Sequence, residues 1–191
     1  MTLLDEQLGA DRTNPMVERT LEQKRRILRH RARLLARSTT RASDPEQNLN
    51  FVEFLLSGER YAVESVHVRE VLVPSDITPV PCTPQHIHGI INVRGKIISV
   101  MDLRVLFGLP HNGPSPKDKV LILTSENMEF GILAEELVGA ETAALDAVHP
   151  PPSTMQDGRG TYLRGIIGTD LILLDAVKLL SDPTLLVNEE S

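Results

Sequence analysis

The sequence has no tryptophan, and phenylalanine and tyrosine together make up 3% of its 191 residues. Base stacking on aromatic side chains is a main way to bind single-stranded nucleic acid, so the composition disfavours that function. The only cysteine is Cys82, which excludes an internal disulfide. No apolar run approaches the roughly 20 residues of a membrane-spanning helix, and the chain starts without an apolar leader. We therefore expect a soluble, cytoplasmic protein without direct membrane insertion.

Positive charge is unevenly distributed along the chain. Residues 12–41 carry ten Lys and Arg and two Glu, a net charge of +8, whereas residues 42–191 carry ten Lys and Arg against 21 carboxylates, a net −11. Residues 1–11 add −3, which gives the formal net charge of −6. Such a split indicates a basic appendage joined to an acidic body.

The appendage has the pattern of an amphipathic helix over residues 14–38. Leu21, Leu28 and Leu35 recur every seven residues, and Arg residues occupy the other faces. Such a helix can pair with a partner helix, lie on the body of the protein, or contact a membrane surface or phosphates. The polar segment 38–48 reads as a linker, so we predict an extension over 1–47 and a folded domain over 48–187.

From Leu49 onward, short apolar runs alternate with turn signals every eight to twelve residues, which is typical of an all-β fold. Two Pro-rich segments, 74–85 and 149–160, cannot be central strands. A strand that runs into a short helix is expected near the C-terminus. The rhythm favours two small barrels over one sandwich, with hairpin turns predicted at Ser57–Gly58, Arg94–Gly95, Glu126–Asn127 and Gly168–Thr169.

A search for reactive groups finds no catalytic set. The chain lacks a G-x-S-x-G nucleophile elbow and a phosphate-binding P-loop. Glu135 and Glu136 are adjacent, so on a strand they point to opposite faces and cannot work as a pair. His86 and His88, with Cys82 and His67 nearby in sequence, leave a metal site open as an alternative, although their spacing does not match that of a known zinc motif.

Several motifs coincide in one order. The sequence contains "FVEFLLSGERYAVESVHVREVLVP", then "ITPVPCTPQHIHGIINVRGKIISVMDLRVLFGLP", then "VLILTSENMEFGILAEELVGA" and "YLRGIIGTDLILLDAVKLL". From about Leu49 to Leu180 this resembles the CheW family of chemotaxis coupling proteins, most specifically in the N-x-R-G and D-L-R segments. The resemblance implies two five-stranded SH3-like β-barrels packed side by side, with a hydrophobic groove between them.

The same resemblance implies a non-enzymatic adaptor without a cofactor or a resident metal. Family members join the regulatory domain of the histidine kinase CheA to the cytoplasmic tips of methyl-accepting chemoreceptors. We would therefore expect this protein to be recruited to membrane receptor arrays. Kinase contact is usually attributed to the surface of one barrel, and by that analogy we expect much of it around residues 132–138.

The resemblance also assigns site residues. In the family, a glutamate of the V-x-E segment lies close to the arginine of N-x-R-G, and here these are Glu70 and Arg94. An arginine can bind a carboxylate through two parallel hydrogen bonds, so the pair could brace the fold, contact a partner, or do both. Further candidates for the partner surface are Val68, Gly89 and Asn92, and structural support is expected from Gly95, Asp102 and Arg104.

One departure from the family concerns the N-terminus, which is usually shorter. The basic helix leaves open a second hypothesis, a specialised CheW-like adaptor whose N-terminal helix recruits a different partner. A metal-binding protein that uses His86 and His88 is the third hypothesis.

Overall fold

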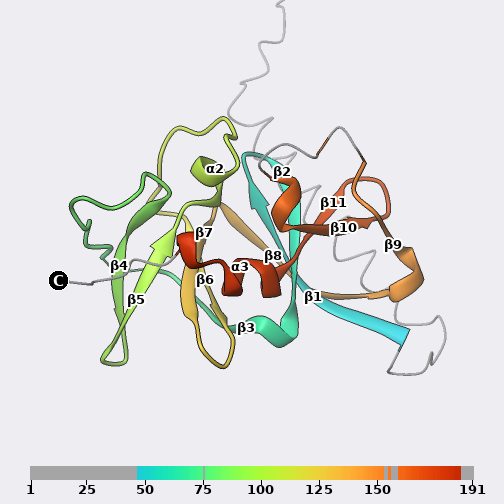
Figure 1. The fold of residues 1–191 in the computed structure, drawn as a ribbon, viewed down its shortest axis with the longest axis horizontal. Coiled ribbons are helices and arrows are strands. Elements are labelled where there is room, and N and C mark those ends of the chain that lie inside the picture. Colours follow the sequence, from blue (N-terminus) through green and yellow to red (C-terminus); the bar gives the residue numbers. More distant parts are fainter. Residues whose placement is uncertain (1–46, 75, 153–154, 156–158, 186–191) are drawn as a thin grey trace, which may run out of the picture. The chain divides into compact units, whose positions relative to one another are not determined.

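A computed structural model describes residues 47–185, except residues 75, 153–154 and 156–158 (Figure 1). These residues belong to one compact unit that spans Asp44–Ser191. The basic helix predicted over residues 14–38 lies outside the described residues, as does most of the predicted linker. The described part is almost entirely β-structure, with two short α-helices, which confirms the predicted all-β class.

One sheet has six strands in the order β8-β1-β2-β11-β10-β9. Its neighbouring strands are antiparallel except β11 and β2, which are parallel. The strands are β1 (Asn48–Leu56), β2 (Glu59–Glu64), β8 (Glu136–Ala144), β9 (Val148–His149), β10 (Leu163–Ile167) and β11 (Leu171–Leu174).

The other sheet has five strands in the order β3-β6-β7-β5-β4, and here β5 and β7 form the parallel pair. The strands are β3 (Val68–Leu72), β4 (Ile87–Val93), β5 (Lys96–Met101), β6 (Lys119–Thr124) and β7 (Glu129–Ala134). All four predicted hairpins form, as β1–β2, β4–β5, β6–β7 and β10–β11. Two turns place non-glycine residues at positive φ, with Ser57 at 51° and Arg94 at 53°, followed by Gly58 and Gly95.

Each sheet closes on itself through one bent segment. In the five-stranded sheet, β3 pairs with β6, and Thr78 farther along the same segment bridges to Ile90 of β4. In the six-stranded sheet, β8 and β9 pair at opposite edges and are joined by the 3-10 turn η3 (Leu145–Ala147). If β8 and β9 are counted as one bent strand, both sheets are five-stranded barrels, as the resemblance implied.

The two barrels exchange hairpins between the halves of the chain. The β4–β5 hairpin, from the first half, joins β7 of the second half, and β10–β11 joins β2 in return. Matched contacts follow each exchanged hairpin, because Asp102 N donates to His86 O and Asp175 N donates to Tyr162 O, both at 2.8 Å. Each barrel therefore contains strands from both halves of the chain, and neither half contains a complete barrel.

Two short helices follow the exchanged hairpins. Helix α2 (Leu103–Leu106) follows β5 and helix α3 (Ala176–Ser181) follows β11, each with an aspartate cap whose side chain accepts a backbone N–H bond. Aspartate at this position satisfies a backbone donor that the helix itself cannot pair. Helix α3 is the predicted short C-terminal helix.

The core has three parts, because strands in the middle of each barrel are buried on both faces. Along β6, Val120 and Ile122 face the interior of the five-stranded barrel, while Leu121 and Leu123 face the layer between the barrels. A smaller cluster fills the six-stranded barrel. Four aromatic rings cross the shared layer with centroids 6.1–6.3 Å apart, and they belong to Phe54, Tyr61, Phe107 and Tyr162.

Candidate functional site

The structure brings Glu70 and Arg94 together at one end of the five-stranded barrel. Glu70 lies on β3 and Arg94 in the β4–β5 turn, and Arg94 Nη2 donates to Glu70 Oε2 at 3.0 Å. The turn is held by Asn92, whose Oδ1 accepts a 2.8 Å hydrogen bond from Gly95 N. Arg94 is thus positioned by Glu70 and Asn92, which were predicted for the partner surface, and by Gly95, which was predicted for structural support.

The contact differs in geometry from the expected two-bond pair. Arg94 uses one nitrogen on one oxygen of Glu70, and the other oxygen accepts from Arg69, at 2.8 Å from Nη2 and 3.2 Å from Nε. Arg69 also pairs with Glu129 of β7, and Glu129 pairs with Lys96 at the start of β5. Because Lys96 and Arg94 flank Gly95, the five side chains form a charge ring. Its members are Arg94, Glu70, Arg69, Glu129 and Lys96.

A hollow of about 540 Å³ adjoins this ring along the seam between β3 and β4. Glu70 and Arg94 line one part of the hollow, and Thr78, which bridges to Ile90, lines another. Val73 and Ile97 also line it and are each 59% exposed, which is high for large apolar side chains. Exposed apolar groups beside charged ones are typical of a surface that binds another protein.

Two other residues predicted for the partner surface, Val68 and Gly89, are partly or fully buried. Val68, at the start of β3, is half-buried and packs on the core between the barrels. Gly89 of β4 is buried, and a Cβ placed there would lie 2.4 Å from Thr78 O. Gly165 has the matching position in β10, where a Cβ would lie 2.6 Å from His149 O. A side chain at Gly89 would therefore disturb barrel closure before it touched a partner.

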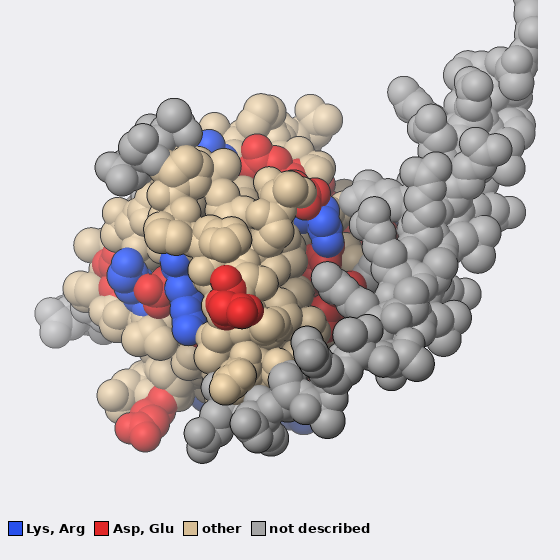
Figure 2. Space-filling model, turned by 90° about the vertical axis from the view of Figure 1, so that its right-hand side faces the viewer, with Lys and Arg blue, Asp and Glu red and all other residues tan. Residues whose placement is uncertain are grey.

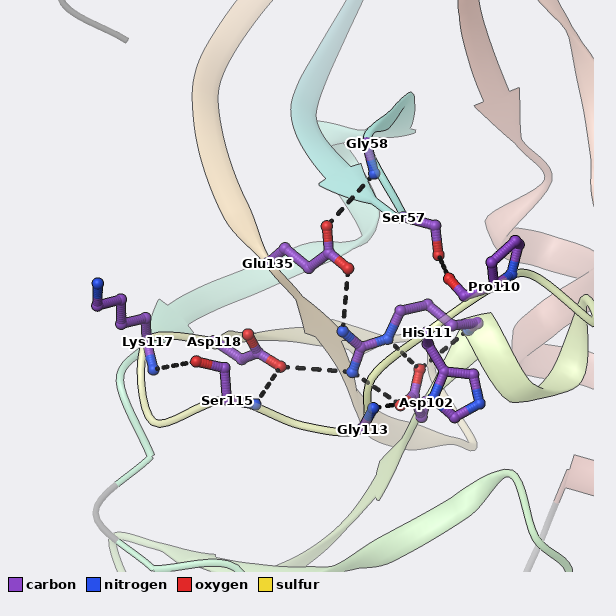
Figure 3. A network of polar contacts seen from close by, with 11 residues as sticks. Ser57, Gly58, Asp102, Pro110, His111, Gly113, Ser115, Lys117, Asp118 and Glu135 are labelled. Atoms are coloured by element: carbon purple, nitrogen blue, oxygen red, sulfur yellow. Dashed lines mark hydrogen bonds and ion pairs between the residues drawn. The ribbon is translucent and has the colours of Figure 1, made fainter. Parts of the chain in front are cut away.

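Asp102 and Arg104 form a buried network just after β5, at the end of the strand away from the β4–β5 turn. Figure 3 shows the carboxylates of this network, Asp102, Asp118 and Glu135. The Arg104 side chain is 2% exposed and binds Asp102 through two bonds, Nε to Oδ1 and Nη2 to Oδ2, both 2.8 Å long. It also contacts Asp118 at 3.4 Å and Glu135 at 3.1 Å. The hydrogen bonds to Asp102 raise the pKa of Arg104, so the guanidinium stays charged.

This network joins the two barrels. Glu135 lies between β7 and β8, where the chain passes from one barrel to the other, and its Oε2 accepts from Gly58 N in the β1–β2 turn at 3.4 Å (Figure 3). Arg104 therefore links α2, the start of β6 and the crossover. The sequence analysis treated Glu135 only as a possible catalytic partner of Glu136 and assigned no role to Asp118. A search for carboxylates able to pair with the arginine of the D-L-R motif would have identified both residues as candidates.

The region expected to hold the kinase contact does not lie on one barrel. Ile132 is in β7 of the five-stranded barrel, whereas Val138 is in β8 of the six-stranded barrel. Residues 132–134 are buried because β7 is an inner strand with both faces covered. Only the part after the crossover at Glu135 reaches the surface, so the expectation of a single-barrel surface over 132–138 was wrong.

The histidine cluster does not assemble. Among the described residues, which include His67, Cys82, His86 and His88, no group of three or more His, Cys, Asp or Glu side chains could hold a metal ion. His86 precedes β4, and its Nε2 is buried without a hydrogen-bond partner among those residues. Burial lowers the pKa of His86, and nearby Asp182 opposes that shift.

The helices within the described ranges are four and six residues long, and none could cross a lipid bilayer.

The fold and these contacts define the chain as a paired SH3-like β-barrel domain. Residues 50–184 match the CheW-like domain family, and the chain belongs to the CheW family. It is 30% identical to the chemotaxis protein CheW of Treponema pallidum over 147 residues, 73% of this chain and 86% of that one.

Two further comparisons agree with this assignment. The chemotaxis protein CheW of Helicobacter pylori is 27% identical over 128 residues, 66% of this chain and 78% of that one. The crystal structure of the scaffolding protein TtCheW from Thermoanaerobacter tengcongensis superposes with a TM-score of 0.60 at 31% identity, covering 66% of this chain and 88% of that one. The chain is thus a CheW-like member of a chemotaxis scaffold family, as the motifs predicted.

Proposed function

We propose that this protein is a non-enzymatic adaptor that couples chemoreceptors to the histidine kinase CheA. It would bind the CheA regulatory domain and the cytoplasmic tips of methyl-accepting chemoreceptors, and so be recruited from the cytoplasm to receptor arrays. The observation that carries this proposal is a hollow with two exposed apolar side chains, Val73 and Ile97, beside the Glu70–Arg94 pair in a CheW-family domain. Docking needs such a surface, whereas catalysis would need a reactive set.

The proposal is tested with purified components. The full chain should bind both an isolated CheA regulatory domain and a chemoreceptor cytoplasmic fragment, and adding all three should yield a ternary complex in sedimentation assays. Binding to neither component would overturn the adaptor assignment. Binding to only one of them would overturn the bridging role.

Arg94→Ala tests the site within this function. The Arg94 side chain is 82% exposed, and among the described residues it pairs with Glu70 alone, so its removal should leave the melting temperature almost unchanged. We expect loss of receptor-fragment binding with retained CheA binding, measured by titration calorimetry. A parallel loss of binding and of melting temperature would assign Arg94 a bracing role only.

The charge split of the chain supports a second candidate, a specialised adaptor whose basic N-terminal segment selects a different partner. Residues 12–41 carry a net +8 against −11 for residues 42–191. Removal of residues 1–47 should then change which receptor fragments are bound. Unchanged partner selection would leave the segment without a role in specificity.

A further inference from the structure

In the charge ring, the cationic side chains are more exposed to solvent than the carboxylates. The three cations have side chains 82% (Arg94), 63% (Lys96) and 33% (Arg69) exposed. The two carboxylates beneath them are less exposed, Glu70 at 22% and Glu129 at 7%. Solvent and any approaching partner therefore meet the cations first.

Two other ion pairs of the domain have the opposite arrangement, whereas Arg164 and Lys178 are, as in the ring, more exposed than their carboxylate partners. On the six-stranded barrel, Arg60 is 31% exposed against 60% for its partner Asp170, and Arg159 is 21% exposed against 47% for Glu59. On the face drawn in Figure 2, most Lys and Arg side chains lie beside Asp and Glu side chains. The ring is thus a cationic end on a domain of net negative charge, and it gathers three of the ten Lys and Arg of residues 42–191.

The outer cations keep hydrogen-bonding capacity for a partner. A guanidinium has five N–H donors, and among the described residues Arg94 uses one of them, Nη2, on Glu70. Among the same described residues, the Lys96 ammonium group forms an ion pair only with Glu129. Carboxylates are the groups that such donors bind best in proteins.

The ring also fixes where the cations stand. Glu70 holds Arg94 on one side of the turn, and Glu129 holds Lys96 on the other, while Arg69 joins the two carboxylates. A turn tied on both sides loses less side-chain freedom when a partner binds. Glu129 is therefore a positioning residue, because it acts through Lys96 and Arg69.

We propose that the β4–β5 turn is an electropositive docking tip that binds an acidic segment of a partner protein, with Lys96 and Arg94 as its direct contacts. The tip borders the exposed apolar side chains of Ile97 and Val73, so the matching partner segment carries carboxylates next to an apolar side chain. This inference rests on the proposed function, in which that partner is the receptor tip. Its own content is the sign of the charge that is recognised and the role of Lys96.

Lys96→Glu tests the inference against a matched control, Lys117→Glu. Lys117 is an exposed residue of the loop before β6, outside the ring and the hollow. Both substitutions change the net charge by the same amount. Affinity for a chemoreceptor cytoplasmic fragment should fall at least tenfold for Lys96→Glu and less than twofold for Lys117→Glu, and binding by the Lys96 variant should depend less on salt concentration. Equal effects of the two substitutions would overturn the docking tip and leave the adaptor function in place.

A second probe separates this inference from the receptor assignment. A short polyglutamate peptide is titrated into the isotope-labelled full chain, and backbone NMR resonances of residues 93–97 are followed. Shifts confined to the turn that disappear in Lys96→Glu, but not in Lys117→Glu, support the tip even if no receptor fragment binds. Shifts spread over the surface, or none, together with receptor binding that ignores Lys96, would overturn it.

Discussion

At the scale of single residues, the two arginines of the N-x-R-G and D-L-R motifs, Arg94 and Arg104, differ in burial and hence in role. Arg104 is enclosed by carboxylates, whereas Arg94 is almost fully exposed. Residue type alone does not distinguish them, because both follow apolar strands in one short stretch of sequence. The difference arises because Arg104 follows β5 near the crossover between the barrels, where Glu135 contacts it, whereas Arg94 lies in the turn before β5.

The buried network predicts a large effect for Arg104→Ala. The substitution leaves Asp102 and Asp118 buried without their cation, and breaking one member of a buried pair typically costs about 3–5 kcal/mol. Urea denaturation should show a loss of that size, while Arg94→Ala, at an exposed pair, should change the free energy of unfolding by less than about 1 kcal/mol. Similar values for the two variants would contradict the structural role of Arg104.

At the scale of elements, the C-terminal turn η6 (Pro183–Leu185) and helix α3 surround a small polar group. Tyr162 donates to Asp182 Oδ2 at 2.6 Å, and Asp182 also accepts from the Thr184 hydroxyl at 2.7 Å. These bonds, led by that of Tyr162, lower the pKa of Asp182. Burial, followed by the bond to Asp182, raises the pKa of Tyr162 to about 12.

The ionisable residues around Asp182 include His86 and Tyr162. Their pKa shifts predict that the free energy of unfolding falls on both sides of neutral pH. His86 has a folded-state pKa below its usual 6.5, so its stabilising contribution is complete above about pH 6.5 and is lost as the pH falls toward the folded value, because the unfolded chain then binds the proton more readily. Tyr162 acts in the opposite sense, and its contribution is lost as the pH rises from about 10 to about 12.

Urea unfolding of the wild type and of His86→Gln between pH 8 and pH 5 measures the contribution of His86. The wild type should lose more stability across this range than the variant, which has no imidazole to protonate. Parallel pH profiles for the two proteins would contradict a lowered pKa of His86 in the folded state.

At the scale of the whole molecule, the hairpin exchange makes the two barrels interdependent. Each barrel is completed by strands from both halves of the chain, and the largest core cluster lies between the barrels. Most of the apolar surface is therefore buried only when both halves are present.

Fragments of the chain test this interdependence. Residues 1–114 and 115–191, each expressed alone, should lack a cooperative unfolding transition, and mixing them should restore the circular dichroism spectrum of the intact chain. A cooperative melt of either fragment by itself would show that one half can close its own barrel.

The sequence alone determined the all-β class, the four hairpins and the pairing of Glu70 with Arg94, because strand periodicity, turn residues and family motifs are local features of the chain. It could not reveal that Arg69, Glu129 and Lys96 complete a ring, since these residues come from three strands that meet only at the end of a closed barrel. The partners of Arg104 and the hairpin exchange also depend on long-range pairing. Tertiary structure decided these features because burial and electrostatic contact depend on distance in space, which one-dimensional order does not fix.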